Sequence, residues 1–169
     1  MAAVGLAPRG ANFAGFAACA VLTAYALYQQ HVVGLEPCHL CILQRVGIIA
    51  LGVVFLAAAL QNPGATGGRV YAGLLGLVAL ATAGTAARHA WIQQQPAGSV
   101  PACGADLDFM MEIMPLHEVL VAVFTGGGEC QKIDWSLFGL SMPVWVLMAA
   151  VALGAFGLWA NLRRRRRTF

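Results

Sequence analysis

Charge is scarce in this sequence. Only 10% of its 169 residues are Asp, Glu, Lys or Arg, whereas 60% are hydrophobic and the mean hydropathy is +0.75. Soluble globular domains carry about 25% charged residues, so this composition excludes an ordinary water-soluble fold. The excess of basic residues is small, with a net charge of +3, and we expect no nucleic-acid partner.

The apolar residues are gathered in four uncharged or nearly uncharged runs, at about 11–28, 42–60, 70–87 and 143–162. Each run has about 18–20 residues, enough at about 1.5 Å per residue to cross a hydrocarbon core about 30 Å thick. We therefore expect residues 1–169 to form one all-α membrane domain, a four-transmembrane-helix bundle. The first run is too long for the apolar core of a signal peptide, and no convincing small-residue cleavage site follows it, so we expect it to be retained.

The placement of charge predicts the orientation of the bundle. All seven acidic residues fall in two connecting segments, about 29–41 and 91–141. Seven of the ten basic residues lie on the other side of the four runs: Arg9, Arg69 and Arg163 to Arg167. Because basic residues concentrate in cytoplasmic loops, both termini are expected in the cytoplasm and the two acidic segments outside.

The second outer segment has about fifty residues, far more than the connection of two neighbouring helices requires, and is therefore a candidate functional region. Within it, Leu116–Phe124 has a pattern that fits a short amphipathic helix on the membrane surface. A helix buried in the loop fits the same pattern equally well.

Four of the five cysteines lie on the outer side: Cys38, Cys41, Cys103 and Cys130. Outside a bacterial inner membrane, thiols meet an oxidising compartment in which disulfides form and persist. The fifth cysteine, Cys19, stands alone in the first run, and we interpret it as a small apolar packing residue.

Cys38 and Cys41 form a CxxC pair at the edge of the second run. If a helix starts at Pro37, where a missing N–H costs nothing, then Cys38, Cys41 and Arg45 fall along one face. The first turn of a helix also favours a thiolate, which is the reactive form of cysteine. This arrangement predicts a redox dithiol with a basic neighbour.

Other interpretations of the cysteines can be weighed. A covalent haem site needs a histidine directly after the second cysteine, where Ile42 stands instead. A four-cysteine zinc site would favour a second close pair, whereas Cys103 and Cys130 are 27 residues apart, so we expect no metal. A disulfide between Cys103 and Cys130 would be worth roughly 3–4 kcal/mol by chain entropy, and a purely structural role for it stays open.

Arg45 is unusual because an arginine at the centre of a membrane helix costs on the order of 2.5–3.5 kcal/mol, less near the helix end. It either snorkels to the surface or stabilises negative charge on a buried acceptor beside Cys41. At the outward end of the third run, His89 and Arg88 are each a candidate to polarise that acceptor or supply a proton, or are simply helix-end residues.

Three segments, "PCHLCILQR", "RHAWIQQQPAGSVPAC" and "ECQKIDWSLFGLSMPVW", resemble the DsbB family, and the similarity runs through all four apolar runs and both outer segments. The resemblance implies a quinone-dependent, disulfide-forming oxidoreductase of the bacterial inner membrane whose active site faces the periplasm. It implies quinone, either ubiquinone or menaquinone, as cofactor and a periplasmic thiol oxidase of the DsbA type as partner. We expect a monomer.

The resemblance also implies roles for the site residues. The reduced partner would attack a Cys103–Cys130 disulfide at Cys103, and the released Cys130 would attack the CxxC disulfide at Cys38. Cys41 would then become the thiolate that meets a quinone near Arg45. His89 matches a family position beside the quinone, so quinone binding is expected to involve both Arg45 and His89.

Two residues depart from the family pattern or stand inside its motif. Gln44 occupies a position where relatives often have glutamate, and His39 lies within the CxxC, where it either tunes the thiolates or points into the outer loop. Three alternatives remain: a specialised paralogue with one dedicated thiol partner, a quinone oxidase similar to vitamin K epoxide reductase, and a non-catalytic membrane protein with two structural disulfides.

Overall fold

The structure is a computed structural model that describes residues 7–96, 112, 115–125 and 128–163. Its elements, in chain order, are α1 (Pro8–His31), α2 (His39–Gln61), α3 (Ala65–Ile92), α5 (Leu116–Thr125), the 3-10 helix η1 (Gly128–Gln131), β1 (Ser136–Leu137), β2 (Leu140–Ser141) and α6 (Met142–Leu162).

Within these described ranges, four helices are long and apolar enough to cross a membrane, namely α1, α2, α3 and α6. They coincide with the four apolar runs, so the predicted all-α, four-helix membrane fold is confirmed. Each helix extends past its apolar run by one to several residues, because backbone hydrogen bonding continues into residues that need not be apolar. A further helix, α5, occupies the segment expected to be helical in the second outer loop.

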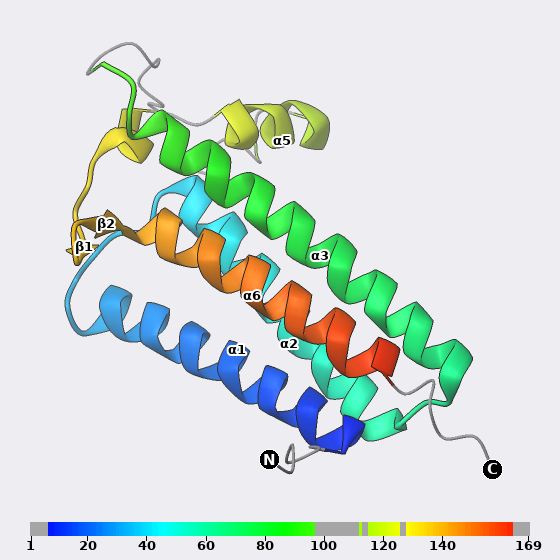
Figure 1. Cartoon of the computed structure of the whole chain (residues 1–169). Helices are drawn as coiled ribbons and strands as arrows, with labels where there is room; N and C mark the ends of the chain where they lie inside the picture. Colours follow the sequence, from blue (N-terminus) through cyan, green and yellow to red (C-terminus); the bar gives the residue numbers. More distant parts are fainter. Residues whose placement is uncertain (1–6, 97–111, 113–114, 126–127, 164–169) are drawn as a thin grey trace.

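The four long helices form an antiparallel bundle (Figure 1). The most extensive contacts join α3 to α6, α1 to α2 and α2 to α3, whereas α1 and α6 touch only sparsely. The main apolar cluster of the bundle includes the fully buried Phe55 and also Cys19, as expected for a packing residue. The bundle is therefore closed on three sides and loosely joined between α1 and α6.

Small residues let α6 lie close against α3. A Cβ atom added to Gly154 would lie 2.6 Å from the Cβ of Ala79, and one added to Gly157 would lie 2.8 Å from Cδ1 of Leu75. The Cβ of Ala79 cannot rotate away, so a larger residue at position 154 would push the helices apart, whereas one at position 157 would require the Leu75 side chain to move. Close helix approach of this kind is what stabilises bundles in lipid, where no hydrophobic effect drives helices together.

A two-residue hairpin leads the chain into α6. Its strands, β1 and β2, are joined by Phe138 and Gly139, both with positive φ (51° and 77°), as the commonest tight hairpin turn requires. The indole of Trp145 donates a hydrogen bond to the Leu137 carbonyl at 3.2 Å, which fixes the hairpin to the first turns of α6. The hairpin, η1 and the α1–α2 connection lie at one end of the bundle, which we call the hairpin end (Figure 1).

At the opposite end, two buried asparagines join α1 to α6. Nδ2 of Asn12 donates to Oδ1 of Asn161 at 3.2 Å, and Nδ2 of Asn161 donates back to Oδ1 of Asn12 at 2.9 Å and to the Gly157 carbonyl. Both side chains are almost completely buried. Because each amide satisfies the other, the pair fixes one end of the otherwise sparse α1–α6 interface.

Replacing one member of this pair should destabilise the bundle. Asn161→Leu leaves the Asn12 amide buried without its partner, and we expect a loss of about 0.6–2 kcal/mol in unfolding free energy, measured by denaturation in mixed micelles. The double variant Asn12→Leu/Asn161→Leu should regain part of this loss, because no orphaned amide remains. Thr23→Val, which removes a hydrogen bond to Cys19 within α1, is the control. A double variant that loses more unfolding free energy than the two single variants lose together would contradict this account.

Candidate redox site

The CxxC pair stands where α2 begins, at the hairpin end. Cys38 is the N-cap residue of α2, with φ −66° and ψ 166°, and Cys41 lies in the first turn. The helix thus begins at His39 and not at Pro37, because the extended backbone of Cys38 leaves Pro37 outside. The Cys38 carbonyl still accepts the first helical hydrogen bond, from the amide of Ile42 at 3.1 Å.

The two thiols lie side by side. Their Sγ atoms are 3.2 Å apart, both residues are half-buried, and both thiols are free in the structure. A disulfide bond is about 2.05 Å long, so a small rotation of the side chains suffices to join the sulfurs. The geometry of the pair therefore allows a disulfide to form between Cys38 and Cys41.

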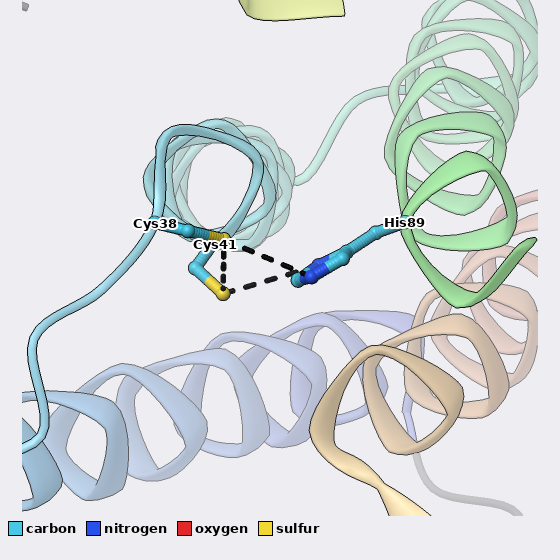
Figure 2. Close-up of side chains that lie close together, drawn as sticks. All are labelled: Cys38, Cys41 and His89. Atoms are coloured by element: carbon cyan, nitrogen blue, oxygen red, sulfur yellow. Dashed lines mark hydrogen bonds between the residues drawn. The ribbon is translucent and has the colours of Figure 1, made fainter. Parts of the chain in front are cut away.

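His89 reaches the pair from another helix. Its Nε2 atom is 3.7 Å from Sγ of Cys38, and its Nδ1 atom is 3.9 Å from Sγ of Cys41. Figure 2 shows the imidazole extending from α3 towards the two sulfurs. The side chain is only 2% exposed. Of the two basic residues at this end of α3, His89 therefore reaches the cysteines, whereas the guanidinium of Arg88 lies over the ring of Trp91, 4.7 Å from its centroid.

Gln44 is a residue of this site for which no role was predicted from the sequence. Its Nε2 atom is 3.0 Å from Nδ1 of His89, and its side chain is 3% exposed. An amide N–H donated to Nδ1 requires the ring proton on Nε2, which faces Cys38; the amide turned the other way pairs with the opposite tautomer. One signal could have identified this residue: Gln44 is a polar side chain in an apolar helix, three residues after Cys41 and so on the same face.

Arg45 does not snorkel freely to the surface. Its Nη1 atom donates a hydrogen bond to Oε1 of Gln30, and its Nη2 atom donates to the Ala26 carbonyl at 3.3 Å. Both acceptors belong to α1, so the guanidinium bridges α2 and α1 beneath the CxxC pair. In the described part of the chain, the buried Nε atom of Arg45 has no hydrogen-bond partner.

These side chains share one cavity of about 980 Å³ between α1, α2 and α6. Its polar wall includes Cys38, Cys41, Gln44, Arg45 and His89. Its apolar wall comes from α1 and α6 and includes Leu22, Val146, Met148, Ala149 and Ala152.

A second groove, of about 650 Å³, follows α1 and α6 and shares three of its lining residues with the cavity: Leu22, Ala149 and Ala152. The cavity therefore continues along the loosely packed side of the bundle.

The cysteines of the second outer segment are placed only in part. Cys130, in η1, is 1% exposed and belongs to a small apolar cluster with Leu40 and Ile92, against which Cys38 packs. Cys103 lies outside the described residues. The structure thus brings Cys38, Cys41, Arg45, His89 and Cys130 to the hairpin end.

Known proteins with similar sequences identify the family of this chain. The family model described as "Disulfide bond formation protein DsbB" matches residues 8–160. A protein of Nitrosococcus oceani named disulfide bond formation protein B is 49% identical over 154 residues, 91% of each chain. Its namesake in Methylobacillus flagellatus is 50% identical over 153 residues, 90% of this chain and 92% of its own.

A third relative, disulfide bond formation protein B 1 of Pseudomonas aeruginosa, is 44% identical over 157 residues, 93% of this chain and 96% of its own. These similarities cover all four long helices and the segments that carry the clustered side chains. The chain belongs to the DsbB family.

Proposed function

We propose that this protein is a thiol:quinone oxidoreductase of the bacterial inner membrane that reoxidises a periplasmic DsbA-type thiol oxidase. Membership of the DsbB family supports a disulfide-forming role. The observation that carries the finer proposal is the convergence of the CxxC pair, His89 and Arg45 on one cavity along the loosely packed α1–α6 side. A dithiol beside a cavity that continues along lipid-facing helices can reach an acceptor dissolved in lipid.

The residues present fit a quinone. The cavity is large enough for a substituted ring, its α6 wall is apolar, and its α1 wall combines the apolar Leu22 and Ala26 with polar side chains such as Gln30. The buried Nε–H of Arg45 has no acceptor among the described residues, and such an orphaned donor suits a quinone oxygen. When bound, a quinone supplies an acceptor for two electrons. The second groove, along α1 and α6, would hold the apolar tail of the quinone.

Arg45 and His89 would have different roles at this site. The positive charge of Arg45 favours the Cys41 thiolate and stabilises negative charge that develops in the cavity. His89, oriented by Gln44, would hold a proton on Nε2 facing the sulfur of Cys38. Burial of these groups strengthens their electrostatic effect because little water screens them.

Electrons would enter through the second outer loop. The thiolate of the reduced partner attacks Cys103, forming a mixed disulfide and releasing Cys130 as a thiolate. Cys130 then attacks Cys38, which forms a Cys130–Cys38 disulfide and releases the thiolate of Cys41. The second thiol of the partner displaces Cys103 from the mixed disulfide, which leaves the partner oxidised, and Cys103 then attacks Cys130, which re-forms the Cys103–Cys130 disulfide and releases Cys38. The two electrons then lie on the Cys38–Cys41 dithiol. Packing of Cys38 against the cluster that contains Cys130 supports the second exchange.

The energetics favour a quinone as terminal acceptor. DsbA has a reduction potential of about −120 mV, and about 30 mV corresponds to 1.4 kcal/mol for two electrons. An ordinary protein dithiol is far more reducing, so its disulfide cannot reoxidise such a partner unless a stronger oxidant removes the electrons. Because that oxidant is dissolved in lipid and the partner in water, the enzyme must lie at their boundary.

Steady-state quinone reduction by the purified full-length protein, with a reduced DsbA-type partner, tests the proposal. We expect wild type and Cys19→Ala to reduce quinone at similar rates, because Cys19 only packs in the core. Cys38→Ser should fall to background, since Cys130 loses its target. Equal turnover in wild type and Cys38→Ser would contradict the enzymatic function and leave the cysteines a structural role.

Arg45→Ala should separate the two halves of the reaction. Removing a hydrogen bond from a charged donor costs about 1.5–3 kcal/mol, so the KM for quinone should rise about tenfold to a hundredfold. Thiol–disulfide exchange between the partner and the second outer loop should proceed at the wild-type rate. This rate is measured by trapping the mixed disulfide. Arg88→Ala, whose guanidinium lies over Trp91, is the matched control. An equal loss of quinone reduction and thiol exchange in Arg45→Ala would contradict this role.

A further inference from the structure

We propose that the reduced Cys38–Cys41 pair and His89 form a binding site for a thiophilic divalent metal ion of the Zn²⁺ or Cd²⁺ type. One ligand atom from each residue lies within 4.8 Å of the other two. Two sulfurs and one imidazole nitrogen are a typical ligand set for such ions. The consequence for turnover, inhibition of disulfide formation, rests on the proposed function, whereas the binding itself does not.

The distances suit an ion placed between the three side chains. Zinc bonds to sulfur at about 2.3 Å and to nitrogen at about 2.0–2.1 Å, so tetrahedral neighbours lie about 3.5–3.8 Å apart. The structure has 3.2 Å between the sulfurs and 3.7 Å between Sγ of Cys38 and Nε2 of His89. Rotations that move these atoms by about half an ångström bring both distances to the zinc values, and the third ligand distance, between Sγ of Cys41 and the imidazole nitrogen, lies within 4.8 Å.

Gln44 determines which nitrogen would bind. Its side-chain amide already contacts Nδ1 of His89 at 3.0 Å, which leaves Nε2 for the metal. With the amide turned so that Oε1 accepts the Nδ1 proton, Nε2 carries a lone pair on the side of Cys38. A metal-bound histidine almost always donates its other N–H in this way, so Gln44 is a positioning residue for the site.

Charge and access also fit a divalent ion. The site lines the large cavity, which leaves a fourth coordination position for water, and Glu129 and Asp134 line the same cavity. Arg45 and Lys132 line it too and oppose a cation. Two thiolates neutralise a divalent ion, however, and binding to the two thiols releases two protons without any change in oxidation state.

The site exists only in one redox state. A Cys38–Cys41 disulfide has no thiolate to offer, so the ion binds the reduced form and then withholds both sulfurs from oxidation. The sequence-based expectation of no metal rested on the missing second cysteine pair. The spacing could not reveal this site because the third ligand comes from α3, about fifty residues further along the chain.

Cobalt binding tests the site directly. The full-length Cys103→Ser/Cys130→Ser protein is reduced, freed of reductant and titrated with Co²⁺, and thiolate-to-cobalt charge-transfer bands are followed. We expect one ion per chain, with tetrahedral visible bands, and no signal after oxidation or in Cys38→Ser. Bands that persist in the oxidised protein, or no bands in the reduced protein, would overturn the proposal.

The third ligand and its positioning residue have matched controls. His89→Ala should weaken cobalt binding at least tenfold, whereas His39→Ala, inside the CxxC, should bind as wild type does. Gln44→Leu should weaken binding by about 10–100-fold, and Gln44→Glu should restore it, because a carboxylate accepts the same proton. X-ray absorption of the zinc-loaded protein with wild-type His89 and Gln44 should find two sulfurs and an imidazole. A zinc site without an imidazole ligand in the X-ray absorption spectrum would refute the assignment, even if a variant folds poorly. Equal cobalt affinity in His89→Ala and wild type would refute it as well.

Activity assays separate this inference from the proposed function. Zn²⁺ should stop quinone reduction by wild type, and a chelator should restore it. Normal quinone reduction in a protein that binds no cobalt overturns the metal site alone. Cobalt binding in a protein that never reduces quinone overturns the proposed function and leaves the metal site standing.

Discussion

A hydrogen bond between two buried side chains, Gln44 and His89, is the interaction on which the site depends. It joins α2 to α3 at the hairpin end and leaves neither polar group without a partner in an apolar bundle. It also determines the ring orientation, so that one nitrogen faces Gln44 while the other faces the sulfur of Cys38. Burial makes this arrangement costly to lose, because an unpaired polar group in such surroundings is penalised by several kcal/mol. Gln44 therefore holds His89 beside the CxxC pair, and the imidazole cannot readily move away.

The unequal packing of the bundle explains how such a site can serve two environments. Helices α3 and α6 lie close together through Gly154 and Gly157, whereas α1 and α6 touch only sparsely and are joined by the asparagine pair at the far end. The looser side leaves room for the cavity beneath the CxxC pair, and Arg45 bridges α2 to α1 across it. Tight packing supports the thiols on one side, and loose packing opens a route towards lipid on the other.

The sequence predicted the fold well because four apolar runs of membrane-spanning length leave few alternatives. It also singled out Cys38, Cys41, Arg45 and His89, since thiols and cations are rare in such a chain, and the structure places these residues around one cavity. It did not reveal the role of Gln44, because an amide has no motif of its own and its partner lies 45 residues away on α3. The start of α2 was placed at Pro37 because proline suits the first turn of a helix. The helix begins at His39 instead, because the backbone of Cys38 is extended. Cys103 and its surroundings remain a prediction from the sequence.

In the proposed function, electrons pass directly from the Cys38–Cys41 dithiol to quinone. Anaerobic mixing of ubiquinone or menaquinone with the pre-reduced Cys103→Ser/Cys130→Ser protein measures this single step, with quinone absorbance and free thiols followed together. We expect one quinone to be reduced for each two thiols lost, and both thiols to belong to the CxxC pair. Thiols that stay reduced while the quinone stays oxidised would contradict it.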